Sequence, residues 1–226
     1  MKKLAAVIFD LDGVIANTVE LYFEAGKRLA DELNVPYSRE LNQKLQGLNR
    51  YKTVEIMLGD KVNLYSEAEI CSHGDLKSEY YRELLETLSE KDVLPGILDF
   101  LNEIKEFRIK TALASSSSNA DLVLKKLGVE KYIDYVVDIR EVKNGKPSPE
   151  IFLLAAEGLG IAPHNCAAIE DGEAGLAGIM ATEMFSIGVG KHKEMAKANW
   201  YIESTTELQL NTLLEKWGDF HEKRCY

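Results

Sequence analysis

An uninterrupted apolar run followed at once by two aspartates constrains the fold of this chain more than any other feature. The stretch Leu4–Thr18 reads LAAVIFDLDGVIANT, and no polar residue interrupts it between Leu4 and Phe9. Such a run predicts a strand buried on both faces, as in a parallel sheet. Alternate residues of an extended segment point the same way, so Asp10 and Asp12 should share one side just past the end of the strand.

Two carboxylates at that position allow two interpretations. Ligands of open α/β sheets bind at the carboxyl ends of the strands, and close carboxylates repel each other unless a proton or a cation lies between them. The alternative is a turn at the end of a strand with two solvated acids, because aspartate is common in turns. The spacing alone leaves both interpretations open.

The rest of the chain separates into a helical block and an alternating block. Residues from about 17 to 90 show helical spacing and no strand pattern. From Val93 onward, strand patterns alternate with helices, which indicates a parallel sheet with helices on both faces. We therefore predict an α/β fold with a doubly wound, Rossmann-like core of residues 1–16 and 91–226. A small all-helical cap of residues 17–90 is inserted after the first strand.

Four local predictions follow from the same patterns. Thr18 is a candidate N-cap of the first cap helix. Residues 59–66 are expected to form a loop. Residues 66–88 are expected to form a long helical region that breaks near His73 and Gly74. Residues 132–138 are expected to form a strand.

Composition limits the classes of partner. Lys and Arg number 27 against 37 Asp and Glu, a formal net charge of -10. This balance argues against nucleic acid or an anionic membrane as the main partner. The three cysteines are far apart and form no CxxC, so neither a disulfide framework nor a zinc site is indicated. The first apolar run is too short for a signal peptide or a membrane span, and we expect a cytoplasmic monomer.

Three further polar clusters follow predicted core strands. Ser115–Asn119 reads SSSSN, a run whose hydroxyls and backbone N–H groups suit a phosphate but also suit an ordinary helix-capping loop. Lys146 lies in NGKPSP, where it either is solvated or neutralises a phosphoryl oxygen and an aspartate. Glu170 and Asp171 form an acidic pair which, together with Asp10, would make an all-oxygen site for a hard cation.

The order of these clusters carries a resemblance. DLDGVIANT is similar to the first motif, DxDGxxxDT, of the haloacid dehalogenase superfamily, and the serine, the lysine and the acidic pair follow in that superfamily's order. The local strings LPGI, ALASSS, KPSPEIF and IEDGEAG and the type of cap resemble the β-phosphoglucomutase branch. The resemblance covers almost the whole chain.

This resemblance implies a role for each core residue. Asp10 would be the nucleophile that forms an aspartyl-phosphate, and Asp12 the general acid/base for the leaving or attacking hydroxyl. The implied cofactor is Mg²⁺, with Asp10, the backbone carbonyl of Asp12, Glu170 and Asp171 as ligands. The groups implied to hold the transferring phosphoryl group are Ser115, Lys146 and the backbone of Leu11 and Ser116.

The resemblance also implies substrate contacts on the cap side. The cap arginine that holds a second phosphate matches Arg50, and the other matching positions are Gly47, Lys77, Ser116 and Asn119. Four positions depart from the family pattern. Asn17 replaces an acid of the first motif, Tyr22 a histidine of the first cap helix, Gly26 an aromatic residue, and Gln46 a lysine. All four touch the cap or the hinge, and none removes core chemistry.

Three function classes remain. The first is a phosphosugar mutase that converts β-glucose 1-phosphate to glucose 6-phosphate, and the second is a Mg²⁺-dependent sugar-phosphate phosphatase with the same core. In both cases the partner is a small phosphorylated sugar. The third is a non-catalytic phospho-sensor, which the DxD spacing and the cap disfavour. A P-loop and a dinucleotide site are excluded, since IGVGKH lacks the P-loop spacing and no GxGxxG follows the first strand.

Overall fold

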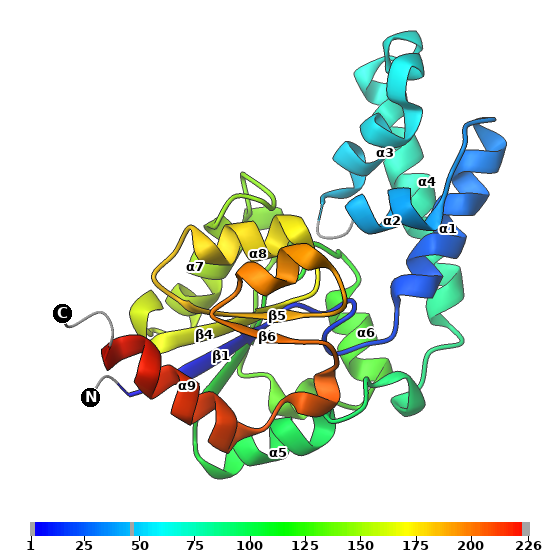
Figure 1. The fold of residues 1–226 in the computed structure, drawn as a ribbon. Coiled ribbons are helices and arrows are strands. Elements are labelled where there is room, and N and C mark those ends of the chain that lie inside the picture. The colour runs from blue at the N-terminus through cyan, green and yellow to red at the C-terminus, as the bar shows by residue number, and fades with distance from the viewer. Residues whose placement is uncertain (1–2, 46–47, 223–226) are drawn as a thin grey trace.

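The computed structural model describes residues 3–45 and 48–222. Its centre is a six-stranded sheet in which every neighbouring pair is parallel, in the order β3-β2-β1-β4-β5-β6 (Figure 1). The strands are β1 (Ala6–Phe9), β2 (Lys110–Leu113), β3 (Tyr135–Val136), β4 (Cys166–Glu170), β5 (Phe185–Val189) and β6 (Trp200–Ile202). The chain builds outward from β1 first on one side and then on the other. This order creates a switch point at the carboxyl end of β1, where such sheets bind ligands.

Helices cover both faces of the sheet, as the sequence predicts. They are α5 (Ile97–Glu106), α6 (Ala120–Lys126), α7 (Glu150–Gly158), α8 (Glu173–Met180) and α9 (Leu210–Glu222). Helices α5 and α9 lie below the sheet in the view of Figure 1, and α7 and α8 lie above it. The doubly wound α/β fold is therefore confirmed.

The side chains of β1 alternate between the two resulting cores. Val7 and Phe9 belong to the larger core, where the Phe9 ring meets Phe100 of α5 edge-on with centroids 6.1 Å apart. Ile8 joins the other core, which includes Phe152 of α7. Both faces of the strand are fully buried. This double burial is the physical reason why the run contains no polar residue.

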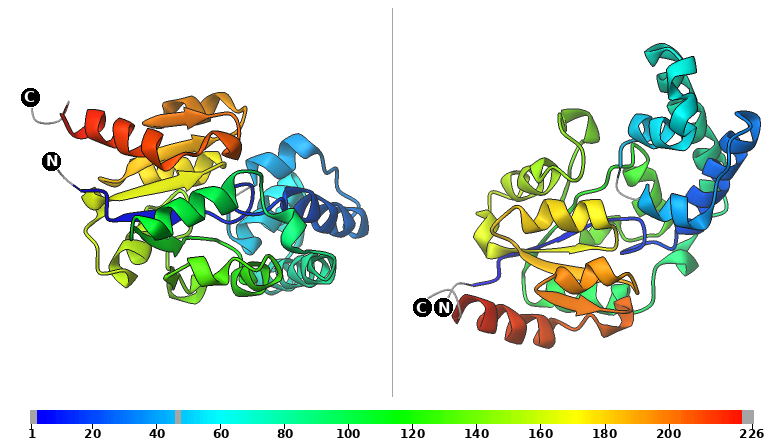
Figure 2. Two further views of the ribbon diagram at one scale, coloured as in Figure 1. Left: turned by 90° about the horizontal axis from the view of Figure 1, so that it is seen from below. Right: turned by 45° about the horizontal axis from the view of Figure 1, so that its top comes forward.

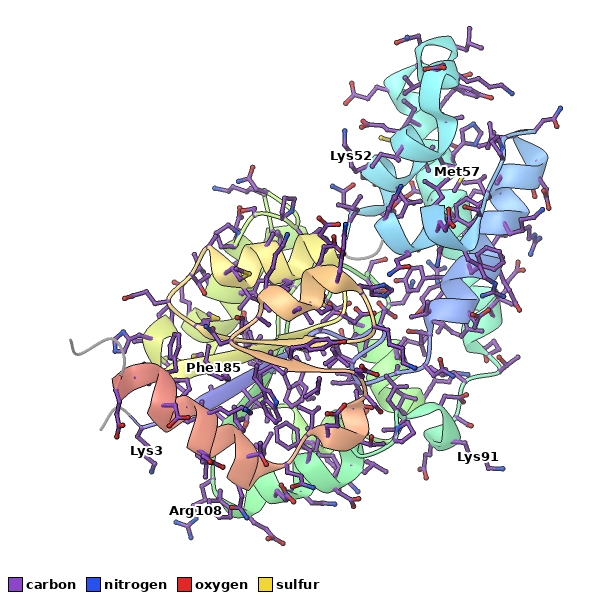
Figure 3. The ribbon with its side chains drawn as sticks, viewed as in Figure 1. Lys3, Lys52, Met57, Lys91, Arg108 and Phe185 are labelled. Atoms are coloured by element: carbon purple, nitrogen blue, oxygen red, sulfur yellow. The ribbon has the colours of Figure 1, made fainter. Side chains whose placement is uncertain are left out.

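The lower core is closed by the C-terminal helix. Phe185 of β5, labelled in Figure 3, is 1% exposed, and its ring centroid lies 6.1 Å from that of Trp217 in α9. None of the helices in the described part of the chain combines the length and the apolar character that crossing a membrane requires.

The named elements between β1 and α5 are all helices in the described part of the chain. They include α1 (Val19–Glu32), α2 (Arg39–Lys44), α3 (Arg50–Leu58), a 3-10 helix (Gly59–Leu64) and α4 (Glu67–Leu85). Figure 1 and the right-hand view of Figure 2 both show these helices beyond the carboxyl ends of the strands, to one side of the sheet. We refer to this helical segment as the cap. Its limits at residues 17 and 90 stay a prediction.

Two linkers join the cap to the sheet, and they run side by side. The Asn17 N–H donates to the Asp92 carbonyl at 2.8 Å, and the Leu94 N–H donates to the Ile15 carbonyl at 2.9 Å. Between these bonds, Ala16 and Val93 form an antiparallel bridge. The chain therefore enters and leaves the cap at one place.

The predicted break in the last cap helix is wrong. Helix α4 runs without interruption from Glu67 to Leu85, and it starts at a capping box formed by Ser66 and Glu69. Gly74 is needed for packing: a Cβ there would lie 2.8 Å from Cδ1 of Tyr51 in α3. The glycine lets two helices approach closely and does not end one.

Thr18 occupies the N-cap position of α1, as predicted, although its hydroxyl donates to the Asp12 carboxylate and makes no capping hydrogen bond. Two other local predictions need correction. Most of the predicted loop at residues 59–66 is the 3-10 helix. Only Tyr135 and Val136 of residues 132–138 pair with a neighbouring strand, because Tyr132 ends a short 3-10 turn. The remaining 3-10 turns are Glu90–Asp92, Glu130–Tyr132, Ile139–Glu141, Pro163–Asn165, Lys193–Lys197 and Thr205–Glu207.

Candidate active site

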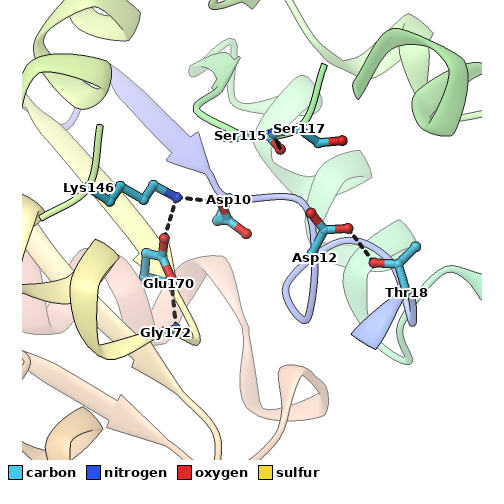
Figure 4. Close-up of polar contacts among 8 residues, drawn as sticks. All are labelled: Asp10, Asp12, Thr18, Ser115, Ser117, Lys146, Glu170 and Gly172. Carbon is cyan, nitrogen blue, oxygen red and sulfur yellow. Dashed lines mark hydrogen bonds and ion pairs between the residues drawn. The ribbon is translucent and has the colours of Figure 1, made fainter. Parts of the chain in front are cut away.

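Asp10 directly follows β1 and is tied to Lys146 across the switch point. The Lys146 ammonium donates to Asp10 Oδ1 at 2.6 Å and also to Glu170 Oε1 (Figure 4). All three side chains are at least 92% buried. Lys146 comes from the loop before α7 and Glu170 from the end of β4. Three segments far apart in sequence therefore meet at one buried ion cluster.

Two glycines make room for the acids beside Asp10. Glu170 Oε2 accepts a hydrogen bond from the Gly172 N–H at 2.8 Å, and a Cβ on Gly175 would lie 1.8 Å from Glu170 Oε1. Gly13 has φ +82°, and a Cβ there would lie 2.0 Å from Asp171 Oδ2. Any larger residue at either glycine would push a carboxylate out of place. The sequence reasoning missed both glycines.

The donor set beside Asp10 fits a hard divalent cation. One carboxylate oxygen from each of Asp10, Glu170 and Asp171 lies within 4.8 Å of the others. Burial raises the pKa of Asp10 to about 8, against the opposing charge of Lys146. Burial and the neighbouring carboxylates raise the pKa of Asp171 well above its usual range. Three acids facing one lysine lack positive charge, and an all-oxygen set of this kind suits Mg²⁺.

The Asp12 side chain turns away from this cluster. Its Oδ1 accepts a hydrogen bond from the Thr18 hydroxyl (Figure 4). The same oxygen accepts a second hydrogen bond, at 3.2 Å, from the Tyr81 hydroxyl of α4. Burial raises the pKa of Asp12, and the Thr18 and Tyr81 hydrogen bonds oppose that shift. Both hydroxyl groups hold the carboxylate in a fixed orientation. Tyr81 was missed by the sequence reasoning, although its position four residues after Lys77 places both on one helix face.

The serine loop after β2 is organised by its own hydrogen bonds. Ser115 Oγ accepts from the Ser117 N–H at 3.1 Å, and Ser117 Oγ accepts from the Asn119 N–H at 3.2 Å. Ser115 is buried close to Asp10, whereas the later residues face the space between core and cap. The loop therefore presents polar groups on the side from which a substrate would approach.

A cavity of about 560 Å³ lies between the sheet and the cap. Asp10, Asp12 and Asp171 line its core side, and Arg50 and Lys77 line its cap side. The cavity is also lined by uncharged polar and aromatic side chains, among them Tyr22, Tyr37, Asn42, Thr53, Ser116, Ser117, Ser118 and Asn119. Acids on one wall and cations on the other suit a small ligand that carries phosphate.

The two cap cations differ in their surroundings. Arg50 is 39% exposed at its side chain; its Nε lies 3.0 Å from Asp75 Oδ1, and its guanidinium donates to Ser118 Oγ at 3.3 Å. Lys77 is only 7% exposed, and burial lowers its pKa to about 8. Its ammonium lies 4.9 Å from the centroid of the Tyr22 ring. Arg50 can exchange partners with a ligand, whereas Lys77 is held among aromatic rings.

Asn119 links the serine loop to the cap. Its Nδ2 donates to Ser78 Oγ at 3.4 Å, and its Oδ1 accepts from Arg82 Nε at 3.5 Å. Together with the contact between Arg50 and Ser118, these bonds place the cap directly over the loop. The cavity is thus a joint product of core and cap.

The structure brings most of the predicted site residues together. Asp10, Asp12, Lys146, Glu170 and Asp171 meet at the switch point. Ser115 lies behind them, and Ser116, Asn119, Arg50 and Lys77 line the cavity. The side chain of Leu11 is fully buried in the core, so only its backbone is available for a ligand. Gly47 and Gln46 lie outside the described residues. The predicted roles of all these residues stay predictions.

Three of the four departures from the family pattern lie in the described part of the chain. The Tyr22 ring stacks on Tyr81 with centroids 4.0 Å apart, and burial together with the nearby Asp12 carboxylate raises the pKa of the Tyr22 hydroxyl. Gly26 makes room for the Tyr37 ring, which occupies the space beside the first cap helix. Asn17 is exposed in the linker and takes part through its backbone.

The chain is similar to known proteins over most of its length. The haloacid dehalogenase-like hydrolases match residues 4–181 of the chain. A β-phosphoglucomutase of Bacillus subtilis is 39% identical over 219 residues, which cover 96% of this chain and 97% of that protein. A phosphorylated carbohydrates phosphatase of Thermotoga maritima is 35% identical, with 76% of this chain and 79% of that protein covered.

A solved structure extends the likeness to the whole fold. The crystal structure of a β-phosphoglucomutase from Clostridium difficile has a TM-score of 0.93 and 37% sequence identity, and the match covers 96% of this chain and 98% of that one. The match therefore includes the sheet and the cap together. Sequence motifs, buried ion cluster and fold agree, and this chain belongs to the haloacid dehalogenase-like hydrolase family.

Proposed function

We propose that this protein is a Mg²⁺-dependent phosphosugar mutase that converts β-glucose 1-phosphate to glucose 6-phosphate through an aspartyl-phosphate on Asp10. The observation that carries the proposal is the cavity, which has the acid cluster with Lys146 behind one wall and two cations on the opposite wall. A mutase must bind a phosphate at each end of its bisphosphorylated intermediate. The likeness to β-phosphoglucomutases over nearly the full chain supports the same activity.

The chemistry begins at Asp10. A carboxylate oxygen of Asp10 attacks the phosphorus of a bisphosphorylated sugar, an O–P bond forms, and the bond from phosphorus to the sugar oxygen breaks. Asp12 donates a proton to the departing sugar oxygen. Lys146 offsets the repulsion between the anionic phosphoryl group and Asp10, and Ser115 with the serine loop holds the phosphoryl oxygens.

The return transfer uses the same groups in reverse. Asp12 accepts the proton of a sugar hydroxyl while that oxygen attacks the phosphorus of the aspartyl-phosphate, and the bond to Asp10 breaks. Asp10, Glu170 and Asp171, with the Asp12 carbonyl, would hold Mg²⁺, which supplies charge neutralisation for the phosphoryl oxygens. The bisphosphate must turn end for end between the two transfers, so the cap side must hold whichever phosphate is not reacting. Arg50 is the forked cation suited to that task.

The cap has a second task in a mutase. Water would hydrolyse the aspartyl-phosphate, so the sugar hydroxyl must reach Asp10 under a cover that excludes bulk solvent. The contacts of Asn119 and Arg50 across the cavity show the cap seated on the serine loop. A seated cap favours transfer to a sugar over transfer to water.

A sugar-phosphate phosphatase is the second candidate. The pairing of Arg50 with the exposed Asp75 favours it, because that carboxylate competes with a second phosphate for the same guanidinium. The relative from Thermotoga maritima, which is 35% identical, is named a phosphatase of phosphorylated carbohydrates. The non-catalytic sensor has no comparable support, since such a sensor needs no capped cavity. Cytoplasmic location and a monomeric state remain expectations from the sequence.

One assay separates the two candidates. The protein is mixed with Mg²⁺, β-glucose 1-phosphate and a trace of glucose 1,6-bisphosphate, and glucose 6-phosphate and inorganic phosphate are followed together. Glucose 6-phosphate without free phosphate establishes the mutase. Release of phosphate at the rate of substrate loss overturns it in favour of the phosphatase.

A further inference from the structure

The part of the cavity beneath the first cap helix contains a group that the proposed chemistry does not use. Tyr37, in the segment between α1 and α2, donates from its hydroxyl to Oδ1 of Asn42 at 2.8 Å. Its ring stacks on Phe23 of α1 with centroids 5.7 Å apart. Both Tyr37 and Asn42 line the cavity. An aromatic ring and a hydrogen bond thus hold one amide side chain in a fixed orientation on the cap wall.

Gly26 makes this arrangement fit. A Cβ at Gly26 would lie 2.4 Å from the Tyr37 hydroxyl oxygen and 2.6 Å from Cζ of the same ring. Any other residue would displace the tyrosine. Gly26 follows Tyr22 by four residues, so it lies on the same face of α1, one turn farther along the helix. Tyr22 is beside Asp12 and Ser117, and the Tyr37–Asn42 pair therefore lies beyond it, on the cap side of the cavity.

The amide nitrogen of Asn42 has no hydrogen-bond partner within residues 3–45 and 48–222. Asn42 is only 6% exposed, and its one side-chain hydrogen bond is at the oxygen. Thr53, 4% exposed on the same cap wall, likewise has no side-chain hydrogen bond to the described residues. The Asn42 amide nitrogen and the Thr53 hydroxyl are not among the fully enclosed side-chain atoms that lack a partner, so both reach the open space of the cavity. Both side chains border the cavity, so a ligand there can supply the missing partner.

The wall around Asn42 is neutral. Tyr37, Asn42 and Thr53 carry no charge, and Arg39 over the Phe23 ring is paired with Glu20 and does not line the cavity. Tyr37, Asn42 and Thr53 themselves offer a phosphate no cation, and the cations among the described cap residues that line the cavity are Arg50 and Lys77. A neutral acceptor oxygen satisfies an amide N–H without the cost of burying an unpaired charge.

We propose that Asn42, held by Tyr37 over Gly26, is a specificity-determining residue that donates from its amide nitrogen to a ring hydroxyl of the sugar, between the two phosphate-binding ends of the cavity. The inference rests on the proposed function, because it names the part of the phosphosugar that this wall reads. It assigns a use to the glycine at position 26. In this arrangement the charged groups of the cavity bind the phosphates, and Asn42 binds the sugar ring.

The test combines variants with substrates that lack single hydroxyls. KM and kcat are measured for Asn42→Leu, Tyr37→Phe and the unaltered protein on β-glucose 1-phosphate and its 2-, 3- and 4-deoxy analogues. We expect Asn42→Leu to raise KM for β-glucose 1-phosphate about tenfold to hundredfold and Tyr37→Phe several-fold less, since Phe keeps the ring and frees the amide to rotate. One deoxy analogue should show the same penalty with the unaltered protein and no further penalty with Asn42→Leu.

Acetyl phosphate is the internal control, because it can phosphorylate Asp10 but has no sugar hydroxyl. Its turnover should be the same in all three proteins, which separates a lost contact from a misfolded cap. Thermal unfolding curves of the variants provide a second check. The inference is overturned alone if the protein converts the sugar phosphate and Asn42→Leu changes KM equally for every analogue, or not at all. If the unaltered protein consumes acetyl phosphate but no sugar phosphate, the proposed function and the inference both fall.

Discussion

The acid cluster at the switch point and the cap wall opposite it are built in different ways. At the switch point, Asp10, Lys146 and Glu170 are buried and form ion pairs with one another. The backbone of Gly175 packs directly against the Glu170 carboxylate. On the cap wall, Arg50 is partly exposed and shares its charge with Asp75 and Ser118. The first group is held in place by its own contacts before a substrate arrives. The second can exchange its partners for those of a ligand.

This contrast suggests which part of the molecule sets chemistry and which part sets selectivity. Groups that position a reacting phosphoryl must hold their geometry, and burial with mutual ion pairing achieves this. Groups that distinguish substrates need partners they can release. One core can therefore serve both mutases and phosphatases, as the two relatives from Bacillus subtilis and Thermotoga maritima illustrate.

The largest expected effect is at Asp10, the proposed nucleophile. Asp10→Asn should lower turnover of every substrate by about 10⁴-fold or more, because the amide cannot form the acyl phosphate. Labelling with radioactive acetyl phosphate should give no phosphoprotein with this variant. Normal circular dichroism serves as the control for folding. Retention of more than a hundredth of the activity would contradict the covalent mechanism.

The next effect is at the buried lysine. Lys146→Met keeps the volume but leaves Asp10 and Glu170 without their cation, and breaking a buried ion pair costs about 3–5 kcal/mol. We expect a loss of that size in the free energy of unfolding, measured by denaturant titration without metal, together with about a 10³-fold loss of activity. Lys143→Met, an exposed lysine in the same loop, is the matched control for stability. Equal stability of the two variants would show that the cluster is not held by Lys146.

A smaller and selective effect is expected on the cap wall. Arg50→Ala should raise KM for glucose 1,6-bisphosphate about tenfold to hundredfold, the value of a charge-assisted contact, and change hydrolysis of small monophosphates less than threefold. Asp75→Asn frees the guanidinium and should lower the same KM about twofold, because a partly exposed ion pair is weak. Losses of similar size on bisphosphate and monophosphate substrates would remove Arg50 from the second phosphate site.

The smallest effect tests the junction of the two regions. Thr18→Val removes the hydroxyl that donates to Asp12 while Tyr81 still holds the carboxylate. We expect kcat for glucose 6-phosphate formation to fall about tenfold with little change in KM, as for loss of one orienting hydrogen bond. Thr18→Ser should restore most of the rate. A change in KM alone would contradict a role in orienting Asp12 and would indicate that Thr18 acts in substrate binding.

The core was largely predictable from the sequence, for a physical reason. The run before Asp10 is apolar because both faces of β1 are buried, and parallel strands place their carboxyl ends together. Once the strands were recognised, Ser115 and Glu170 had to converge, because Ser115 follows β2 closely and Glu170 ends β4. Lys146 reaches them from the loop before α7. Motif order added what spacing alone left open, since it decided against a solvated turn at Asp10 and Asp12.

The cap was predicted less well, because the same residue types there serve several purposes. Gly74 is a residue type that often ends a helix, but here it leaves room for the Tyr51 ring. Gly26 leaves room for the Tyr37 ring in the same way. Thr18 has the position of an N-cap, yet its hydroxyl is drawn to a carboxylate six residues earlier. Such choices depend on neighbours that only the folded chain supplies. No local pattern distinguishes a glycine that ends a helix from one that admits a partner.

The paired linkers have a consequence for how the cap is attached. Ala16 and Val93 are bridged, so the helical segment is attached to the sheet domain in the same way as a long loop whose two ends are joined. The entropy of closing a loop grows only with the logarithm of its length, so the bridge costs little more with a whole cap inside than with a short turn. The helical segment can therefore be exchanged for another without a large change in the free energy of closing the bridge. Replacing residues 17–92 by a two-residue turn should leave a core that still folds, and grafting the segment at the same bridge in a relative should transfer its selectivity.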